Sequence, residues 1–297
     1  MICIQLNGGL GNQMFQYALG RSLAIVNNCD LLLDTTILST KTHSKVEIAR
    51  DFELDIFNIV AKVATKNELR IQKPLLFKLL NTIVYKIGFH GITLPNYYIE
   101  QQFSFDKKVL NVDKSCFLSG YWQSQMYFES ISSIIRDDFK FPIIEDSLNL
   151  SVLTKMKQSN SVSIHLRRGD FLNIKTHSIH GTCSIEYYQR SISYMEKNLS
   201  NPVFFIFSDD IYWAKENLNV TINSFFISGN NGDKSYIDMQ LMSNCNHNII
   251  ANSSFSWWGA WLNSNADKIV IAPKKWFSDK KMNAQTDDLI PTEWIRM

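Results

Sequence analysis

The chain has 297 residues, of which 45% are hydrophobic and 20% charged, and its formal net charge is +2. This composition is typical of a folded globular protein and excludes a disordered chain. The near-neutral charge argues against a general nucleic-acid binder, which needs a concentrated basic surface. The length exceeds one ordinary hydrophobic core, so we expect two domains.

Cysteine usage and hydrophobic segments indicate the compartment. The five cysteines are widely spaced and form no Cys-x-x-Cys pair, which favours reduced thiols over a disulfide framework or a zinc site. The N-terminus has no signal-peptide pattern. No segment reaches about 18 uncharged apolar residues, the length that a membrane span needs. We therefore expect a cytoplasmic protein.

The N-terminal residues follow a strand–turn–helix–strand pattern. Residues 2–6 predict a strand, the glycine-rich run at 7–13 predicts a tight turn, and the apolar spacing of 14–28 predicts a helix. Residues 31–33 predict a second strand, which ends at Asp34. The turn therefore points at a helix N-terminus, whose N–H groups suit an anion.

The same turn contains part of a dinucleotide-binding fingerprint. Gly9 and Gly11 match its first two glycines, and Asp34 follows Gly11 by 23 residues, near the distance expected of the ribose-binding acid. Met14 replaces the third glycine, which allows the helix to approach the strand closely. A dinucleotide-dependent oxidoreductase is therefore an alternative, although the third glycine of its fingerprint is absent.

The middle of the chain is basic. Residues 62–90 contain six Lys or Arg and one acid, and 74–94 predict an amphipathic helix. Its apolar face belongs either to the core or, with its lysines, to an anionic membrane surface. Residues 142–150 predict the crossing between domains, so we expect an N-terminal domain at 1–155 and a C-terminal domain at 156–297.

The second half alternates strands with helices, which predicts a doubly wound parallel sheet. The expected strands are 162–166, 203–207, 224–227, 248–251 and 268–272, and the expected helices are 185–199, 212–218, 236–245 and 257–263. Ligands of such sheets bind beyond the carboxyl ends of the strands. We therefore expect the chemistry of the protein at those ends.

The run Ser-Val-Ser-Ile-His-Leu-Arg-Arg-Gly-Asp at 161–170 begins as a buried strand and ends as a polar loop. Alternation along a strand places His165 and Arg167 on one face. A guanidinium at a strand end is a fixed fork that suits two oxygens of a phosphate or carboxylate. The alternative is a surface Arg–Asp pair beside a buried structural histidine.

Three segments carry a resemblance to a known family. They are Asn-Gly-Gly-Leu-Gly-Asn-Gln-Met-Phe-Gln-Tyr at 7–17, His-Leu-Arg-Arg-Gly-Asp at 165–170 and Asn-Ser-Ser-Phe-Ser-Trp-Trp-Gly-Ala-Trp-Leu at 252–262. With them the chain resembles the bacterial α-1,2-fucosyltransferases of glycosyltransferase family 11 over essentially its whole length. The second segment is shared with α-1,6-fucosyltransferases, so that activity is an alternative.

The resemblance implies an α/β, GT-B-like fold in which two Rossmann-like domains face a cleft, the first on the acceptor side and the second binding GDP-fucose. It implies inverting transfer of L-fucose from GDP-β-L-fucose to the 2-hydroxyl of a terminal galactoside, without metal or other cofactor. The acceptor would be an O-antigen-like or blood-group-H-like glycan. We expect a galactose-terminated oligosaccharide, either free or lipid-linked. We expect the protein itself to make at most peripheral contact with a membrane.

The resemblance and the side-chain chemistry assign the main roles. Arg167 matches the phosphate-binding arginine of the related enzymes and would meet the charge that grows on the leaving diphosphate. Asp170 would orient an arginine rather than react. Asp210 resembles the acid that accepts two N–H groups of guanine; a helix N-cap is its alternative role, for which Asp209 competes.

The other expected substrate-binding residues lie in the same three motifs, where hydroxyls, amides and N–H groups suit phosphate or sugar. They are Asn12, Gln13, His165, Arg168, Asn252, Ser253, Ser254 and Phe255. Asn12 and Gln13 would face the cleft, whereas Phe255 also suits a core face and Ser253 also suits a serine cap.

No catalytic base is assigned from the sequence. His43, His177, His180, Asp170 and several N-terminal acids are all candidates, and an oxocarbenium-like transition state needs little base. A non-catalytic protein that binds nucleotides or glycans is the remaining alternative.

Overall fold

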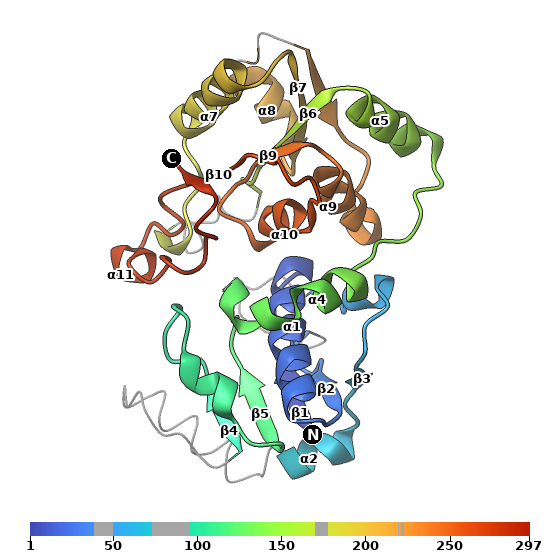
Figure 1. Ribbon diagram of the computed structural model, residues 1–297, viewed down its shortest axis with the longest axis vertical. Coiled ribbons are helices and arrows are strands. Elements are labelled where there is room, and N and C mark those ends of the chain that lie inside the picture. Colours follow the sequence, from blue (N-terminus) through green and yellow to red (C-terminus); the bar gives the residue numbers. More distant parts are fainter. Residues whose placement is uncertain (39–49, 73–95, 170–177, 219, 221–222) are drawn as a thin grey trace. The chain divides into compact units, whose positions relative to one another are not determined.

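The computed structural model describes residues 1–38, 50–72, 96–169, 178–218, 220 and 223–297 (Figure 1). Within these residues the chain divides into two compact units. Unit 1 consists of Met1–Lys140 with Asp287–Leu289, and unit 2 consists of Phe141–Thr286 with Ile290–Met297. The boundary expected at residue 155 falls inside helix α5 (Ser147–Lys157), all of which belongs to unit 2.

Unit 1 is built around a parallel sheet with the strand order β3-β2-β1-β5-β4. The strands are β1 (Ile2–Gln5), β2 (Leu31–Asp34), β3 (Lys62–Val63), β4 (Tyr97–Ile99) and β5 (Cys116–Ser119). The helices are α1 (Leu10–Val26), α2 (Lys66–Gln72) and α4 (Ser132–Asp138), and the 3₁₀ turns are η1 (Leu54–Ile56), η2 (Lys107–Asn111), η3 (Gln125–Tyr127) and η4 (Glu129–Ile131). The predicted N-terminal pattern is confirmed, although α1 begins at Leu10 rather than at Met14.

Helix α1 packs closely on the sheet at Gly20, a glycine outside the dinucleotide fingerprint. A Cβ atom on Gly20 would lie 2.7 Å from Leu31 Cδ1 and 3.2 Å from Ile4 Cγ2, so a larger residue would require these side chains to shift. Met14, which occupies the third fingerprint position, is fully buried in the core. The close helix–strand contact is therefore made further along α1, without the fingerprint geometry.

Buried polar groups join α1 to α4. Asp138 accepts hydrogen bonds from Tyr17 Oη at 2.7 Å and from Arg21 Nε at 3.0 Å. Tyr17 Oη also accepts a hydrogen bond from the main-chain N–H of Val60 at 2.9 Å. Burial, and then the bond to Asp138, raise the pKa of Tyr17, so its hydroxyl stays protonated and donates to the carboxylate.

Replacing Asp138 with alanine should destabilise unit 1 by about 2 to 3 kcal/mol, because it leaves Tyr17 and Arg21 without their shared acceptor. The measurement is the urea midpoint followed by tryptophan fluorescence. The control is Asp137→Ala in the same helix, whose ion pair with Lys140 is largely exposed and should contribute almost nothing. Equal midpoints for the two variants would contradict the assigned role of Asp138.

Unit 2 is built around a second parallel sheet, with the strand order β11-β10-β9-β6-β7-β8. The strands are β6 (Asn160–Leu166), β7 (Pro202–Ser208), β8 (Ser224–Ile227), β9 (His247–Ile249), β10 (Val270–Ala272) and β11 (Ile295–Arg296). Besides α5, the helices are α7 (Ile185–Asn198), α8 (Ile211–Asn217), α9 (Tyr236–Ser243), α10 (Ser254–Leu262) and α11 (Lys280–Asn283), and η6 (Gly232–Lys234) is a 3₁₀ turn. The predicted doubly wound sheet is confirmed; its edge strand β11 was not predicted.

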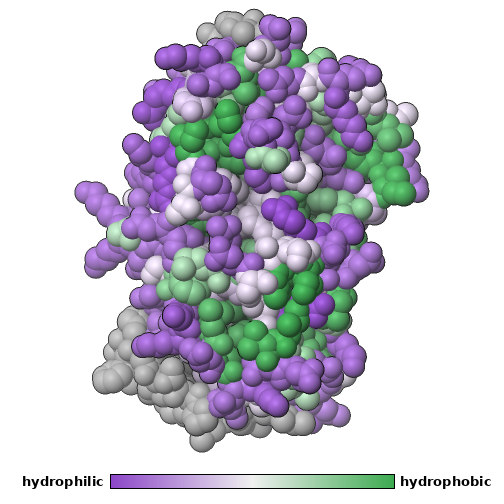
Figure 2. All heavy atoms as spheres, in the orientation of Figure 1, coloured by the Kyte–Doolittle hydropathy of each residue, from purple (hydrophilic) through white to green (hydrophobic). Residues whose placement is uncertain are grey.

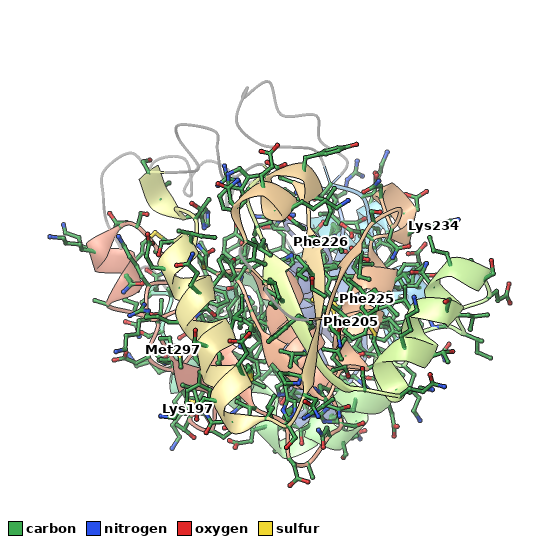
Figure 3. The ribbon with its side chains drawn as sticks, turned by 90° about the horizontal axis from the view of Figure 1, so that it is seen from above. Lys197, Phe205, Phe225, Phe226, Lys234 and Met297 are labelled. Carbon is green, nitrogen blue, oxygen red and sulfur yellow. The ribbon has the colours of Figure 1, made fainter. Side chains whose placement is uncertain are left out.

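The side chains of β7 show why helices cover both faces of this sheet. Phe204 and Ile206 pack in one apolar cluster with residues of α7 and α8, whereas Phe205 and Phe207 pack in another with residues of α5 and α9. The alternation follows from the two-residue period of a strand. Figure 3 shows α7 and α5 on opposite sides of the strands, with Phe205 stacked on Phe225 at 5.4 Å between ring centroids.

Hydrophilic side chains predominate on the face drawn in Figure 2, and hydrophobic residues form smaller patches among them. The most exposed large apolar side chain of the described residues is that of Ile143, at 88%. Among the described helices none combines the length and the apolar character that a membrane crossing requires. The predicted helix at 74–94 lies outside the described residues, so both of its alternative roles stay predictions.

Strand order locates the switch point of each sheet, where neighbouring strands lead to connections on opposite sides. In unit 2 the switch lies between β6 and β9, and in unit 1 between β1 and β5. The crevice beyond the carboxyl ends of such strands is the usual ligand site of an open α/β sheet. The loops after β6, β7 and β9 therefore define the candidate site of unit 2.

Candidate functional site

The loop after β6 is held by a carboxylate from the next strand. Asp209 Oδ1 accepts the main-chain N–H of Arg168 at 2.9 Å, and Asp209 Oδ2 accepts that of Gly169 at 3.0 Å. Oδ2 also pairs with Arg167 Nη1 at 3.2 Å. A Cβ atom on Gly169 would lie 2.8 Å from Oδ2, so a larger residue there would push the Asp209 carboxylate aside. One carboxylate thus orients both the loop and the Arg167 guanidinium.

The two arginines of the motif have different surroundings. The Arg168 guanidinium lies 3.6 Å from the ring centroid of Trp213, and its Nε is 3.7 Å from Asp210 Oδ2, so it is packed onto α8. The Arg167 side chain is 26% exposed while one of its nitrogens is fixed by Asp209. Arg167 therefore fits an anion clamp, and Arg168, expected to bind substrate, instead packs against the protein.

The two adjacent acids after β7 divide two roles between them. Asp210 caps α8, because its Oδ1 accepts the main-chain N–H of Trp213 at 3.1 Å. Asp209 instead holds the loop after β6, a role that the sequence analysis did not foresee. An acid directly after the neighbouring parallel strand was the available signal. Asp210 keeps a second oxygen, Oδ2, on the side of Arg168.

A pocket of about 220 Å³ lies beyond the carboxyl ends of β7 and β8. Asp209, Asp210 and Asp238 line it, together with Asn230 and the exposed ring of Tyr212. Asn230 Nδ2 donates a hydrogen bond to Asp238 Oδ1 at 2.7 Å. Burial raises the pKa of Asp238 to about 6, against the smaller opposing effect of Asn230. The pocket is therefore lined by acceptors, and Asp238 was not among the residues predicted from the sequence.

His165 lies at the end of β6 and is 5% exposed. Burial, and then the charge of Arg167, lower its pKa from the ordinary 6.5 to about 3, so the imidazole is neutral near neutral pH. Within the described chain its Nδ1 has no hydrogen-bond partner, and its ring lies 5.8 Å from that of Phe255. Buried polar atoms are rarely left unpaired, so this nitrogen is suited to a polar ligand group.

The loop after β9 is mostly internal structure. The amide of Asn252 donates to the carbonyls of His180, Gly181 and Trp276, and its oxygen accepts from Cys183 Sγ. This side chain, expected to bind substrate, therefore holds three loops together instead.

The serines that follow Asn252 begin helix α10. Ser253 caps the helix by accepting the main-chain N–H of Phe255 at 3.3 Å. Ser254 is the first residue of α10, and its side chain is half-buried. Ser254 and Phe255 are the expected residues that form the first turn of α10, directly after the cap.

In unit 1, Gln13 differs from its expected position. It is fully buried: Nε2 donates to the carbonyls of Gly8 at 2.9 Å and Asp51 at 2.8 Å, and Oε1 accepts the N–H of Glu53 at 3.0 Å. Its amide therefore fixes the glycine turn rather than facing a cleft. The physical reason is that the N–H groups and the oxygen of this amide already form hydrogen bonds with main-chain groups.

Asn12 lies at the switch point of unit 1. Its Oδ1 accepts a hydrogen bond from Gln123 Nε2 at 2.8 Å, which joins the start of α1 to the loop after β5. Gly8 has φ +79°, and a Cβ atom there would lie 2.4 Å from Asn12 Nδ2, so this glycine is required both for the turn and for the side chain beside it.

The N-terminus of α1, the expected anion seat, is occupied by the protein itself. The main-chain N–H of Leu10 donates to the carboxylate of Glu53, and burial raises the pKa of this acid. A helix N-terminus favours negative charge, which the chain supplies here from its own loop. The glycine turn is therefore stabilised internally.

Three of the expected residues, Asp170, His43 and His177, lie outside the described residues. His180 is described, and its ring packs against that of Phe277 at 5.4 Å between centroids. Across the described ranges no group of three or more His, Cys, Asp or Glu side chains could hold a metal ion.

Each unit has a parallel sheet of the kind found in GT-B glycosyltransferases, and in unit 2 a fixed arginine follows β6 while an acid-lined pocket lies at the ends of β7 and β8. The model of the family described as Glycosyl transferase family 11 matches residues 1–297, so the chain belongs to this family. The resemblance seen in the three sequence motifs is confirmed, and membership removes the oxidoreductase alternative.

The chain is also similar to individual transferases and to a solved structure. The alpha-1,2-colitosyltransferase of Escherichia coli is 36% identical over 305 residues, which cover 100% of this chain and 99% of that protein. Galactoside alpha-(1,2)-fucosyltransferase 1 of Leontocebus fuscicollis is 27% identical over 167 residues, covering 52% of this chain and 45% of that protein. The solved structure of a mutant of Arabidopsis thaliana FUT1 in complex with GDP has a TM-score of 0.50 at 10% identity, covers 91% of this chain and 69% of that one, and shows likeness of fold alone.

The neutral His165 predicts how stability depends on pH. Its folded pKa lies near 3 and its unfolded pKa near 6.5, so the unfolded chain takes up the proton first as pH falls. The stabilising contribution is complete above pH 6.5 and is lost between 6.5 and 3, by up to about 1.4 kcal/mol per pH unit. Urea unfolding of His165→Gln should show a shallower decline over this range than the wild type. Parallel pH profiles would contradict the buried, neutral imidazole.

Proposed function

We propose that this family 11 enzyme transfers a 6-deoxy-hexose from a GDP-linked donor to the 2-hydroxyl of a terminal galactoside, with inversion at the transferred carbon. The observation that carries the proposal is the Arg167 guanidinium, fixed by Asp209 at the switch point of unit 2, beside an acid-lined pocket at the next strand ends. Unit 2 is accordingly the donor-binding unit, and unit 1 the acceptor side.

The pocket beyond β7 and β8 suits guanine among the nucleobases. Guanine carries two adjacent N–H donors on one edge, which an ionised carboxylate accepts together. Asp238 and the second oxygen of Asp210 are carboxylate acceptors on this pocket, and the exposed ring of Tyr212 can cover a base face. Uracil or cytosine would leave acceptors facing acceptors, which a specific site avoids.

The diphosphate would lie between Arg167 and the first turn of α10. As the sugar–phosphate bond breaks, negative charge grows on the diphosphate, and a fixed cation stabilises that charge most when it needs no rearrangement. Arg167 is held in this way by Asp209, and Ser254 adds a hydroxyl at a helix N-terminus. The proposal uses no metal and no cofactor, and it assigns no base for the acceptor hydroxyl.

Two donors remain for the sugar. GDP-L-fucose is favoured by the galactoside fucosyltransferase relative, whereas the full-length relative at 36% identity is a colitosyltransferase and favours GDP-L-colitose. Colitose is fucose without its 3-hydroxyl, so a pocket built to bond this hydroxyl should reject colitose strongly. Comparing kcat/KM for the two donors with one galactoside acceptor decides between them.

The acceptor is proposed from the relatives alone. Both transferases are named for α-1,2 linkages and one of them for a galactoside, which supports the 2-hydroxyl of a terminal galactose. The O-antigen biosynthesis glycosyltransferase WbnK of Escherichia coli, 35% identical over 306 residues, supports an O-antigen-like glycan. A lipid-linked acceptor at the cytoplasmic face of a membrane is part of this proposal.

Arg167→Lys should be nearly as damaging as Arg167→Ala, because a point charge does not reproduce the bidentate fork. We expect kcat/KM to fall by about a hundredfold or more, which corresponds to roughly 3 kcal/mol of transition-state stabilisation. The melting temperature should change little, since the side chain is partly exposed. Arg70→Lys on α2 is the matched control. Full transfer activity in Arg167→Lys would contradict the clamp.

Asp238 predicts a pH dependence of donor binding. Its pKa is raised to about 6, so the acceptor carboxylate is protonated as pH falls through 6 and affinity for GDP-fucose should drop there. GDP-fucose suits the test because its diphosphate diester does not titrate in this range. Asp238→Asn should bind at least about tenfold more weakly at neutral pH, since an amide N–H replaces an acceptor, and should show no step near pH 6.

The control for this experiment is Asp233→Asn, an exposed acid on η6 near the same loop, which should bind as the wild type does. Isothermal titration calorimetry measures all three proteins. An unchanged affinity in Asp238→Asn would remove this acid from the base site while leaving Arg167 to be judged by its own assay.

A further inference from the structure

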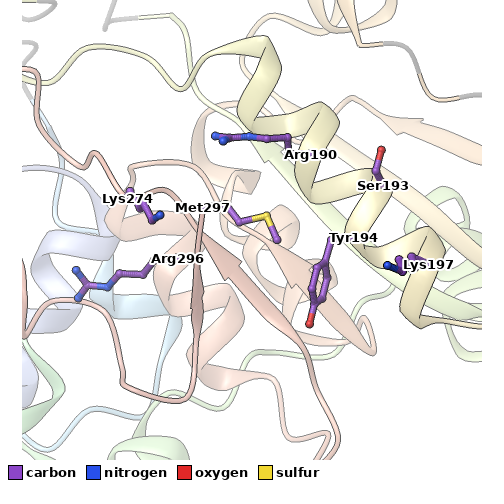
Figure 4. A pocket seen from close by; sticks show the side chains of 7 residues that line it. All are labelled: Arg190, Ser193, Tyr194, Lys197, Lys274, Arg296 and Met297. Carbon is purple, nitrogen blue, oxygen red and sulfur yellow. The ribbon is translucent and has the colours of Figure 1, made fainter.

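A second pocket of unit 2, of about 390 Å³, is strongly basic and shares no lining residue with the acid-lined pocket described above (Figure 4). Four of its seven lining residues are Lys or Arg, and none is Asp or Glu: the cations are Arg190, Lys197, Lys274 and Arg296. The other three are Ser193, Tyr194 and Met297. We refer to this site as the basic pocket.

The strand at the sheet edge builds one side of the basic pocket. Strand β11 pairs with β10, the main-chain N–H of Met297 donates to Ala272 O at 3.0 Å, and that of Lys274 donates to Met297 O at 2.7 Å. These bonds hold Lys274 next to Met297. Arg296 is anchored because its Nη2 donates to Thr286 O at 3.2 Å.

Helix α7 builds the other side. Arg190, Ser193 and Lys197 follow one another on α7 at helical spacing, so they share one face of it. Met297 packs against the apolar cluster of this helix, with its sulfur 3.9 Å from Ser191 Oγ. Figure 4 shows the α7 side chains and the side chains of the strand segment on either side of Met297. Met297, at the base of the pocket, is therefore held by packing, and the cationic side chains lie on both sides of it.

Two of the four cations of the basic pocket, Lys197 and Lys274, are uncompensated within the described residues. Within the part of the chain that the structure describes, the side chains of Lys197 and Lys274 are exposed and make no hydrogen bond or ion pair. Glu186 lies one turn before Arg190 on α7. The pKa of Glu186 is lowered mainly by its hydrogen bond with Ser184 and less by the charge of Arg190, so Glu186 interacts only weakly with this arginine. Cations gathered around one hollow repel each other, and a multivalent anion relieves that repulsion.

The position of the basic pocket separates it from the donor site. Arg167 follows β6, in the middle of the sheet, whereas Arg296 lies on β11, the edge strand, and Lys197 lies in the last turn of α7. The basic pocket therefore lies apart from the candidate donor site of unit 2. Its assignment does not depend on the proposed donor or acceptor.

We propose that the basic pocket binds a phosphate-bearing group, either a diphosphate in solution or the phosphate of a lipid headgroup. Phosphate offers several negative oxygens, which suit the forked guanidinium of Arg190 and the point charges of the two lysines. The hydroxyls of Ser193 and Tyr194 add hydrogen-bond donors at the same hollow. A single carboxylate would neutralise only one of the four cations.

The test uses the full chain with Arg167→Ala throughout, so that the switch-point site does not contribute. In this background Arg190→Glu with Lys197→Glu is compared with Lys280→Glu with Lys281→Glu on α11, which changes the net charge equally away from the pocket. The probes are inorganic pyrophosphate by calorimetry, and vesicles of phosphatidylglycerol or of phosphatidylcholine by co-sedimentation at low salt. Melting temperatures establish that each variant is folded.

Pyrophosphate binding that falls at least about tenfold in the α7 variant and not in the α11 variant supports the proposal. Loss of sedimentation with phosphatidylglycerol in the α7 variant alone identifies a lipid headgroup as the source; binding of pyrophosphate without vesicle binding identifies a soluble phosphate. Absence of binding to both probes, or equal binding by both variants, overturns it. If the α7 variant does not fold, Lys274→Glu on the opposite wall carries the same expectations.

Discussion

The site of unit 2 depends on the contacts of one carboxylate, that of Asp209, with the loop after β6. The register of the parallel pair β6–β7 places Leu166 opposite Ser208, so the residues that follow each strand emerge side by side. Asp209 uses this position to accept two main-chain N–H groups of the neighbouring loop and to pair with Arg167. The arginine is thereby ordered before any ligand arrives, which is what electrostatic stabilisation of a growing charge requires.

Unit 1 uses its polar residues differently. The amides and hydroxyls of α1 are directed inward: Gln13 holds the glycine turn, and Tyr17 with Arg21 holds Asp138. Glu53 supplies the negative charge at the helix N-terminus from within the same unit. The motif at 7–17 is therefore largely a scaffold for the loops around β1 and β5, and Asn12 is its residue at the junction of those loops. The motif at 7–17 thus serves mainly structure, whereas the motif at 165–170 supplies the fixed positive charge of unit 2.

The sequence predicted much of this architecture because periodicity is local. Short apolar runs of strand length, alternating with helical patterns of similar length, predicted the parallel sheet of unit 2, and the position of Arg167 at a strand end predicted an anion clamp. The amides were harder to assign, since an Asn or Gln bonds a ligand and a main-chain carbonyl with the same groups. Asn252 and Gln13 proved to bond carbonyls of loops that are distant in the sequence.

The sequence by itself determined the family, the parallel α/β class and the residue types at the strand ends, because all of these are written in short contiguous runs. The tertiary structure alone decided which acid did what. Asp209 and Asp210 are neighbours with the same chemistry, and only the pairing of β6 with β7 directs one to the loop and leaves the other as a helix cap. It also decided that Asp238 shares a pocket with them and that cations from α7, from the segment after β10 and from β11 line one pocket, because such contacts arise from strand order and helix packing, which no local pattern encodes.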